Sequence, residues 1–171
     1  MIRQKTCVWL AGFFSAAAVI GIQGCGEEKG ETVYKQEDQE VTVKDKGDSV
    51  SVTVKTNEGT GQYTSGAAAT IPKDFPKDVP TYPDMSVEFS GKQGNMFTIS
   101  GRTSDALEKV SASLKSSVVE NGWAETLSMN QAAAGGQPGI MMSYMKEERV
   151  LNLVLAADQG GTAINIMTGQ Q

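Results

Sequence analysis

Hydrophobic and polar residues alternate with a period of two over much of this chain. Between residues 41 and 55, valines take every second position in two runs, which Asp45-Lys46-Gly47-Asp48 separates. β-Branched residues at this period are typical of strands, and the Asp and Gly residues between the runs favour a turn. The pattern predicts a β-hairpin over residues 41–56. Because a lone hairpin is only marginally stable in water, its valine face must cover the rest of the chain or a partner.

The same period returns in the C-terminal part of the chain. Short alternating runs separated by turn residues predict six strands, over residues 85–89, 96–100, 123–129, 140–146, 150–156 and 162–167. Consecutive strands joined by short turns favour antiparallel pairing.

One segment between these strands has a helical period instead. Its regularly spaced apolar residues are Leu107, Val110, Leu114 and Val118. Thr103 or Ser104 is predicted to cap the start of the helix, and Gly122 suits the left-handed position after its end. Trp123 is then expected to pack against the last turn. The predicted fold class is α+β: an antiparallel sheet with one helix packed on one face, in the order ββαββββ, preceded by the β-hairpin.

The segments between these elements differ in composition. Residues 25–40 are charged and predict a tether, and residues 57–70 are rich in Gly, Ser, Thr and Ala and predict a flexible linker. Four prolines between residues 72 and 83 favour an extended strap, whose apolar side chains we expect in the core; they are Ile71, Phe75, Val79 and Tyr82. The predicted organisation is a signal peptide (1–24), a lipid-anchored tether (25–40), the β-hairpin (41–56), the linker (57–70) and a small α+β domain (71–171).

The first 25 residues have the order of an export signal. Arg3 and Lys5 precede an uncharged, largely apolar stretch that ends in Ile22-Gln23-Gly24-Cys25, as in a secretory signal peptide. The tetrapeptide resembles a bacterial lipobox, which implies cleavage between Gly24 and Cys25 and attachment of a lipid to the Cys25 thiol. A plain secretory signal and an uncleaved anchor are the alternatives. At Gly26 the chain lacks the Asp that retains many enteric lipoproteins in the inner membrane, so we expect residence in the outer membrane, facing the periplasm.

Residues 71–168 resemble a small domain of uncharacterised bacterial lipoproteins, in which a "DVPxYP" strap precedes a hairpin, a helix that closes with Gly-Trp, and a meander. The matching residues here are Asp78-Val79-Pro80, Tyr82-Pro83, Gly122-Trp123 and Gly160-Gly161-Thr162. All of them are structural residues. The resemblance therefore implies a fold and a place in the cell envelope, and it carries no catalytic residue to this chain.

The composition argues against several classes of function. The chain has no His, which removes the commonest general base and metal ligand. Without residues 1–24, 13 basic residues stand against 20 acidic ones, and this balance disfavours nucleic acid as a partner. Carboxylates could still provide acid–base chemistry, and the candidates are Glu88, Glu125, Glu147, Glu148 and Asp158. None of them has an obviously apolar setting, so we expect no enzyme, no cofactor and no metal site.

The sequence thus predicts a membrane-anchored envelope lipoprotein that acts as a non-catalytic interaction or accessory protein. Its expected partners are the membrane, through the lipid on Cys25, and an envelope protein. The predicted contact residues are Val50, Val52, Val54, Met141, Tyr144 and Met145. A binder of a small apolar ligand between the helix and the sheet is the alternative function.

Overall fold

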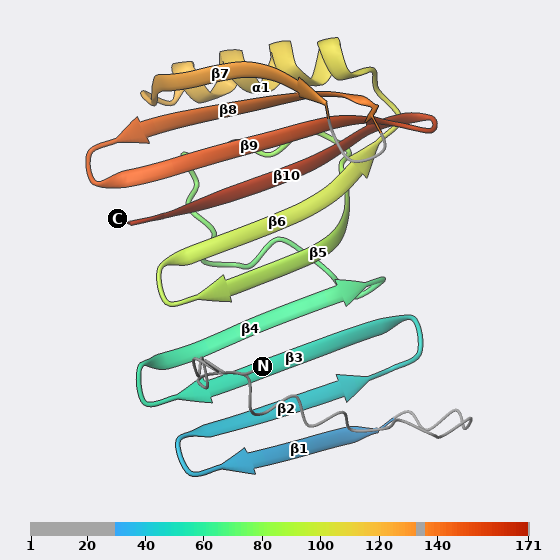
Figure 1. The fold of residues 1–171 in the computed structure, drawn as a ribbon, viewed down its shortest axis with the longest axis vertical. Coiled ribbons are helices and arrows are strands. Elements are labelled where there is room, and N and C mark those ends of the chain that lie inside the picture. Colours follow the sequence, from blue (N-terminus) through green and yellow to red (C-terminus); the bar gives the residue numbers. More distant parts are fainter. Residues whose placement is uncertain (1–29, 133–135, 171) are drawn as a thin grey trace, which may run out of the picture.

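The computed structural model describes residues 30–132 and 136–170, which form one antiparallel sheet of ten strands with a single helix (Figure 1). The elements are β1 (Glu31–Gln36), β2 (Gln39–Asp45), β3 (Ser49–Thr56), β4 (Gly59–Gly66), β5 (Ser86–Gln93), β6 (Met96–Thr103), α1 (Leu107–Glu120), β7 (Ala124–Ala132), β8 (Pro138–Lys146), β9 (Arg149–Asp158) and β10 (Gly161–Gln170). Their order in the sheet is β1-β2-β3-β4-β5-β6-β10-β9-β8-β7. The predicted signal peptide and Cys25 lie outside the described residues.

The predicted α+β fold class is wrong, because the protein is mostly β and the predicted hairpin is not a separate element. The hairpin strands β2 and β3 belong to the main sheet, since β4 pairs with both β3 and β5. β4 occupies the predicted flexible linker and β1 the predicted tether. Both segments have few apolar residues, and they form strands because neighbouring strands satisfy their backbone groups.

The valine hairpin itself forms as its alternation predicts. Val41 lies opposite Val54 and Val43 opposite Val52 in the β2–β3 ladder. In the turn between them Gly47 has a φ of 86°, and its N–H donates to Asp45 Oδ1 at 2.8 Å. Gly tolerates this left-handed conformation without the clash that a Cβ would cause.

The core lies between α1 and one face of the C-terminal strands. The helix contacts β9 and β10 and buries the four residues of its apolar stripe. The sheet contributes Ile99, Met142, Tyr144, Leu151, Leu153, Leu155, Ile164 and Ile166. These side chains are almost completely inaccessible to water and occupy the layer in which a small apolar ligand was the alternative expectation.

The two ends of α1 differ from each other in how well the sequence predicts them. Ala106 precedes the helix and makes no side-chain cap, so the prediction of Thr103 or Ser104 as the cap is wrong. Thr103 instead ends β6, because the ladder with β10 extends to it. At the other end Gly122 has a φ of 82°, and the Trp123 N–H donates to Val118 O at 3.2 Å. The Trp123 ring is buried and contacts Asp78 and Arg149, and its packing against the last turn of the helix stays a prediction.

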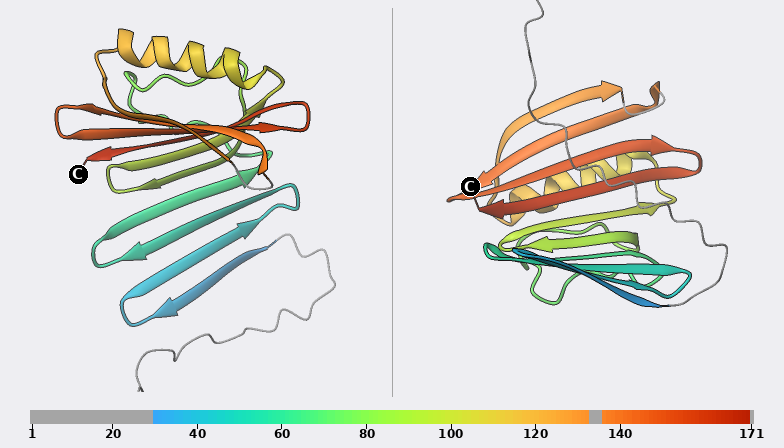
Figure 2. Two further views of the ribbon diagram at one scale, coloured as in Figure 1. Left: turned by 45° about the horizontal axis from the view of Figure 1, so that its top comes forward. Right: turned by 60° about the horizontal axis from the view of Figure 1, so that its bottom comes forward.

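The proline-rich strap lies on the same side of the sheet as α1 (Figure 2, green). Val79 and Tyr82 are buried in the core, and the Phe75 ring meets Phe97 edge to face, with 5.6 Å between centroids. The expectation fails for Ile71, which is exposed because the chain reaches the core only further along.

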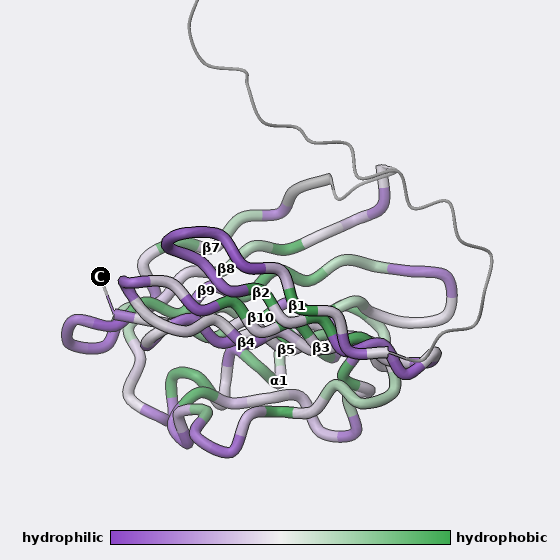
Figure 3. The backbone as a smooth tube through the Cα atoms, turned by 90° about the horizontal axis from the view of Figure 1, so that it is seen from below, coloured by the Kyte–Doolittle hydropathy of each residue, from purple (hydrophilic) through white to green (hydrophobic). Residues whose placement is uncertain are grey.

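Strands β1–β4 extend the sheet beyond the helix and the strap (Figure 1). Every buried hydrophobic side chain of the described residues belongs to the chain from Ala69 onward. Figure 3 shows the sheet from its β1 end, with hydrophilic turns and with α1 on one side of the sheet. The N-terminal part of the sheet is therefore a single layer.

Candidate functional site

The sheet face opposite α1, here called the open face, is covered by no helix or strap of the described residues. It is traced by strand alternation, because directly paired residues in a ladder point to the same side. In β10 the core residues Ile164 and Ile166 alternate with Asn165 and Met167. Met167 lies opposite Thr98 in β6 and Asn152 in β9, which places both on the open face.

At the C-terminal end the open face is rich in methionine. Met129 lies directly opposite Met141, and Met141 lies opposite Val154. The exposed members of this cluster, each about two-fifths accessible, are Leu127, Met129, Met145 and Met167. Large apolar side chains gathered on one uncovered surface are typical of a contact surface for another molecule.

At the N-terminal end the same face carries the five valines of β2 and β3. All five are half-buried, although only neighbouring side chains of the same layer cover them. Tyr34, Tyr63 and Met96 continue the apolar surface on adjoining strands, and Met96 is 60% exposed. Tyr63 stacks on Phe89 with 6.4 Å between ring centroids.

A band of uncharged polar groups crosses the open face over β6, β10, β9 and β8, and Ser143 in this band lies between Met141 and Met145. Ser143 Oγ donates to Asn152 Oδ1 at 2.7 Å, and Asn165 Nδ2 donates to Ser100 Oγ at 2.6 Å. Asn165 Oδ1 is the only buried side-chain polar atom of the described residues without a hydrogen-bond partner. A molecule on the open face can bury apolar area there, whereas Asn165 Oδ1 is itself inaccessible from the surface.

The structure brings most of the predicted contact residues onto the open face. The valines of β3 and the residues Met141 and Met145 all lie there, at opposite ends of the sheet. Tyr144, also predicted to be a contact residue, is instead completely buried in the core. Its hydroxyl donates to Met142 Sδ at 3.3 Å, and burial raises the pKa of Tyr144 to about 12. The alternation of side chains along a strand explains this burial. Ser143 and Met145 point to the open face, so Tyr144 between them points to the core.

Five exposed residues of the open face were not among the predicted contact residues: Tyr34, Met96, Leu127, Met129 and Met167. For the last four, the alternation was visible in the sequence. The sequence does not show which side of each strand the helix covers. Only this side distinguishes a core residue from a residue of the open face.

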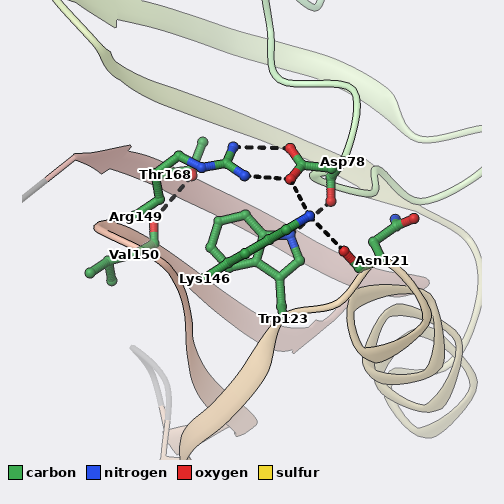
Figure 4. A network of polar contacts seen from close by, with 7 residues as sticks. All are labelled: Asp78, Asn121, Trp123, Lys146, Arg149, Val150 and Thr168. Carbon is green, nitrogen blue, oxygen red and sulfur yellow. Dashed lines mark hydrogen bonds and ion pairs between the residues drawn. The ribbon is translucent and has the colours of Figure 1, made fainter.

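A polar cluster on the opposite side fixes the strap to the sheet (Figure 4). Asp78 in the strap accepts from both terminal nitrogens of Arg149, at 3.0 Å for Nη1–Oδ1, and from Lys146 Nζ at 2.8 Å. Trp123 Nε1 donates to the Asp78 carbonyl at 2.8 Å, and the guanidinium lies 4.9 Å from the centroid of the Trp123 ring. The hydrogen bonds from Arg149, supported by those from Lys146, hold the pKa of Asp78 far below its usual range. These contacts occupy the carboxylate, so the cluster has a structural role.

A hollow of about 810 Å³ lies at the rim where the β9–β10 turn meets the start of α1. Four of the charged groups that line it form two pairs: Arg102 contacts Asp158, and Lys109 Nζ donates to Asp105 Oδ1 at 2.8 Å. The Lys109 and Tyr82 hydrogen bonds lower the pKa of Asp105, and the bond to Asp105 raises that of Tyr82. Both shifts move away from neutral pH, so neither group is prepared for acid–base chemistry near pH 7.

The candidate carboxylates from the sequence are dispersed over the surface. Glu88 pairs with Arg102 at 3.1 Å and Glu125 with Lys115 at 2.8 Å. Glu147 and Glu148 form the turn between β8 and β9. Across residues 30–132 and 136–170, no group of three or more acidic or thiol side chains is placed to hold a metal ion.

Comparison with known proteins returned no matching family model, curated protein or solved structure. The resemblance to the lipoprotein domain therefore stays a prediction. In the part of the chain that the structure describes, no helix has the length and apolar character needed to span a membrane.

Proposed function

We propose that this protein is a lipid-anchored bacterial envelope protein that acts as a non-catalytic interaction protein through its open face. The observation that carries this proposal is the uncovered apolar surface opposite α1. Met145 and Met167 remain about two-fifths accessible there, although Met142, Tyr144, Ile164 and Ile166 on the other face of the same strands are almost completely buried. Burial of apolar surface stabilises by roughly 25 cal/mol for each Å². A partner that covers these side chains would gain this free energy on binding.

The chemistry of the open face defines the partner. Its two apolar clusters and its uncharged polar band fit a surface that is largely apolar and carries uncharged polar groups. Charges such as Arg102 and Asp158 lie near the turn between β9 and β10. We therefore infer an envelope protein with a largely uncharged contact surface.

A site-specific crosslinker tests this function in intact cells. We expect a photoreactive residue at Met145 to trap a discrete partner, and one at Ala112, exposed on α1, to trap none. Met167→Lys should abolish the crosslink from Met145 without lowering the melting temperature, because the charge would lie in the contact surface and not in the core. Equal crosslinking from Ala112, or crosslinking from Met145 that ignores Met167→Lys, would contradict the proposal.

The anchor is tested independently of the contact surface. We propose that Cys25 carries fatty acyl chains and holds the protein in the outer membrane, facing the periplasm. Metabolic labelling with a fatty acid should mark the protein, and Cys25→Ala should remove the label and release the protein from the membrane, because two acyl chains give stable anchoring. A label that persists in Cys25→Ala would refute the lipid site, and fractionation wholly with inner-membrane markers would refute the outer-membrane assignment.

A further inference from the structure

Among the described residues, strand β1 forms one edge of the sheet with no neighbour on its outer side. Its outward backbone groups follow from its register with β2. The Asp45 N–H donates to Gly30 O at 3.0 Å, so these two residues form a hydrogen-bonded pair. Such pairs alternate along an antiparallel ladder. The backbone groups of Thr32, Tyr34 and Gln36 therefore point toward β2, and those of Glu31, Val33 and Lys35 point away from the sheet.

These three outward residues are arranged to pair with a second copy of themselves. A two-fold axis perpendicular to the sheet at Val33 places Val33 opposite Val33 of the other copy and Glu31 opposite Lys35 of the other copy. Each of these pairs then exchanges two backbone hydrogen bonds, because both residues present their N–H and C=O outward. If the two β1 strands were shifted by two residues relative to each other, Glu31 would no longer lie opposite Lys35 of the other copy.

The charges on the adjoining strands match this register. Glu40 in β2 lies between Lys55 in β3 and Lys35 in β1, with N–O distances of 3.0 and 3.1 Å. On the same face Glu31 pairs with Lys44 at 3.2 Å. Across the two-fold axis, positive and negative side chains continue to alternate. Lys35 lies opposite Glu31 of the other copy, and that Glu31 pairs with Lys44 of its own chain. Opposite charges in directly paired positions stabilise a ladder.

The edge strand also exposes two large apolar side chains, Val33 at 46% and Tyr34 at 48%. In the two-fold arrangement Val33 contacts its own copy and Tyr34 lies opposite Thr32. The other edge strand is less suited to such pairing, because the β7–β8 register shifts between Glu125 and Leu127. The β1–β2 ladder has no such shift.

We propose that two copies of this protein associate through antiparallel pairing of their β1 strands, with Val33 on the two-fold axis. The two sheets then form one continuous sheet, and their open faces lie on the same side because the axis is perpendicular to the sheet. The proposal goes beyond the contact function of the open face and does not depend on it. A shared membrane anchor would only raise the local concentration of the second copy.

The mass of the full chain in mild detergent tests this pairing. We expect light scattering to give a dimer for the natural protein and for Val33→Thr, and a monomer for Val33→Pro. Proline removes the outward N–H at the axis but no bond to β2, so Val33→Pro should keep its circular dichroism and melting temperature. A natural protein that stays monomeric at every concentration, or a Val33→Pro variant that stays dimeric, would overturn the proposal.

Crosslinking through engineered cysteines gives a second test that does not depend on the proline variant. Val33→Cys should form a disulfide-linked dimer with an added oxidant, since hydrogen-bonded pairs have Cα atoms about 5.5 Å apart. Lys35→Cys is the matched control, and in both variants the engineered cysteine is the free thiol, since Cys7 leaves with the proposed signal peptide and the proposed lipid occupies Cys25. The two copies of the control position would be separated by four residues along the strands, about 13 Å. Equal crosslinking from both positions would overturn the register. Met167→Lys should leave dimerisation unchanged, which separates this test from that of the proposed function.

Discussion

At the scale of single residues, Asp78 holds three parts of the molecule together. Its carboxylate binds Arg149 and Lys146 from the two ends of the β8–β9 turn, and Lys146 Nζ also donates to the carbonyl of Asn121 after α1 at 2.8 Å. These groups are only about a quarter exposed. One side chain therefore couples the strap, the sheet and the helix end.

Asp78→Asn removes the charge that both cations share. We expect the free energy of unfolding to fall by about 1.5–3 kcal/mol, the usual range for hydrogen bonds to charged groups. Thermal melting should follow, with a loss of about 2–4 °C for each kcal/mol in a chain of this size. Asp84→Asn, an exposed change in the same strap, is the control and should alter melting little.

The direction of the pKa shift of Asp78 determines how the difference in unfolding free energy between the natural protein and Asp78→Asn depends on pH. Since folding lowers the pKa of Asp78, its contribution is complete above the unfolded value of about 3.9 and is lost as the pH falls through the lower folded value. Unfolding curves of the natural protein and Asp78→Asn should thus differ by a constant amount between about pH 5 and 8. The difference should narrow below about pH 4. A difference that widens in acid would contradict this role of Asp78.

At the scale of elements, strand β10 shows the contrast between the two faces of the sheet. In β10, Ile166 is completely buried under α1, and its neighbour Met167 is 38% exposed on the open face. The two residues share a strand and differ only in the side to which they point.

Truncating these two neighbours should have very different effects. Ile166→Ala should lower the free energy of unfolding by about 2–5 kcal/mol, because it leaves a cavity in the core. Met167→Ala should change it by no more than about 0.5 kcal/mol, as is usual for surface positions. Denaturant unfolding of both variants checks this. A comparable loss for Met167→Ala would mean that the open face is covered within the folded protein.

The sequence predicts an element best where its own side chains enforce the period. The valines of β2 and β3 and the apolar stripe of α1 are such cases, and their strands and helix form where the pattern places them. β4 has no such pattern, because Gly59, Thr60 and Gly61 carry no apolar alternation. It is a strand because β3 and β5 lie on either side of it, which no local signal reveals.

At the scale of the whole molecule, the sheet consists of a two-layer part and a single-layer part. The buried hydrophobic cluster draws on the strap, α1, Trp123 and the strands β6, β8, β9 and β10. Strands β1–β4 add ladder hydrogen bonds and the valine surface but no member of that cluster. The sequence predicted the core residues of the helix because their spacing is local. It could not predict the extent of the sheet, or the open face, because both depend on which strands pair.

The two-layer part should therefore fold by itself. A chain that begins at Ala69 retains every residue of the core cluster, and we expect it to unfold cooperatively in denaturant, at a lower midpoint because β5 becomes a free edge. The complementary fragment of residues 30–66 should stay unfolded, since a single layer buries too little apolar area. An aggregated or molten product from the longer chain would mean that β1–β4 are needed to complete the core.

The pairing of β6 with β10 has a consequence for the speed of folding. Every other pairing in the sheet joins strands that follow each other along the chain, but Thr98 meets Met167 only after the whole helix and three strands have been passed. Closing so long a loop lowers the conformational entropy of the chain before any contact between β6 and β10 can stabilise it. The two meanders can each form rapidly, and their docking through β6 and β10 is the step that should limit the rate at which the native state appears.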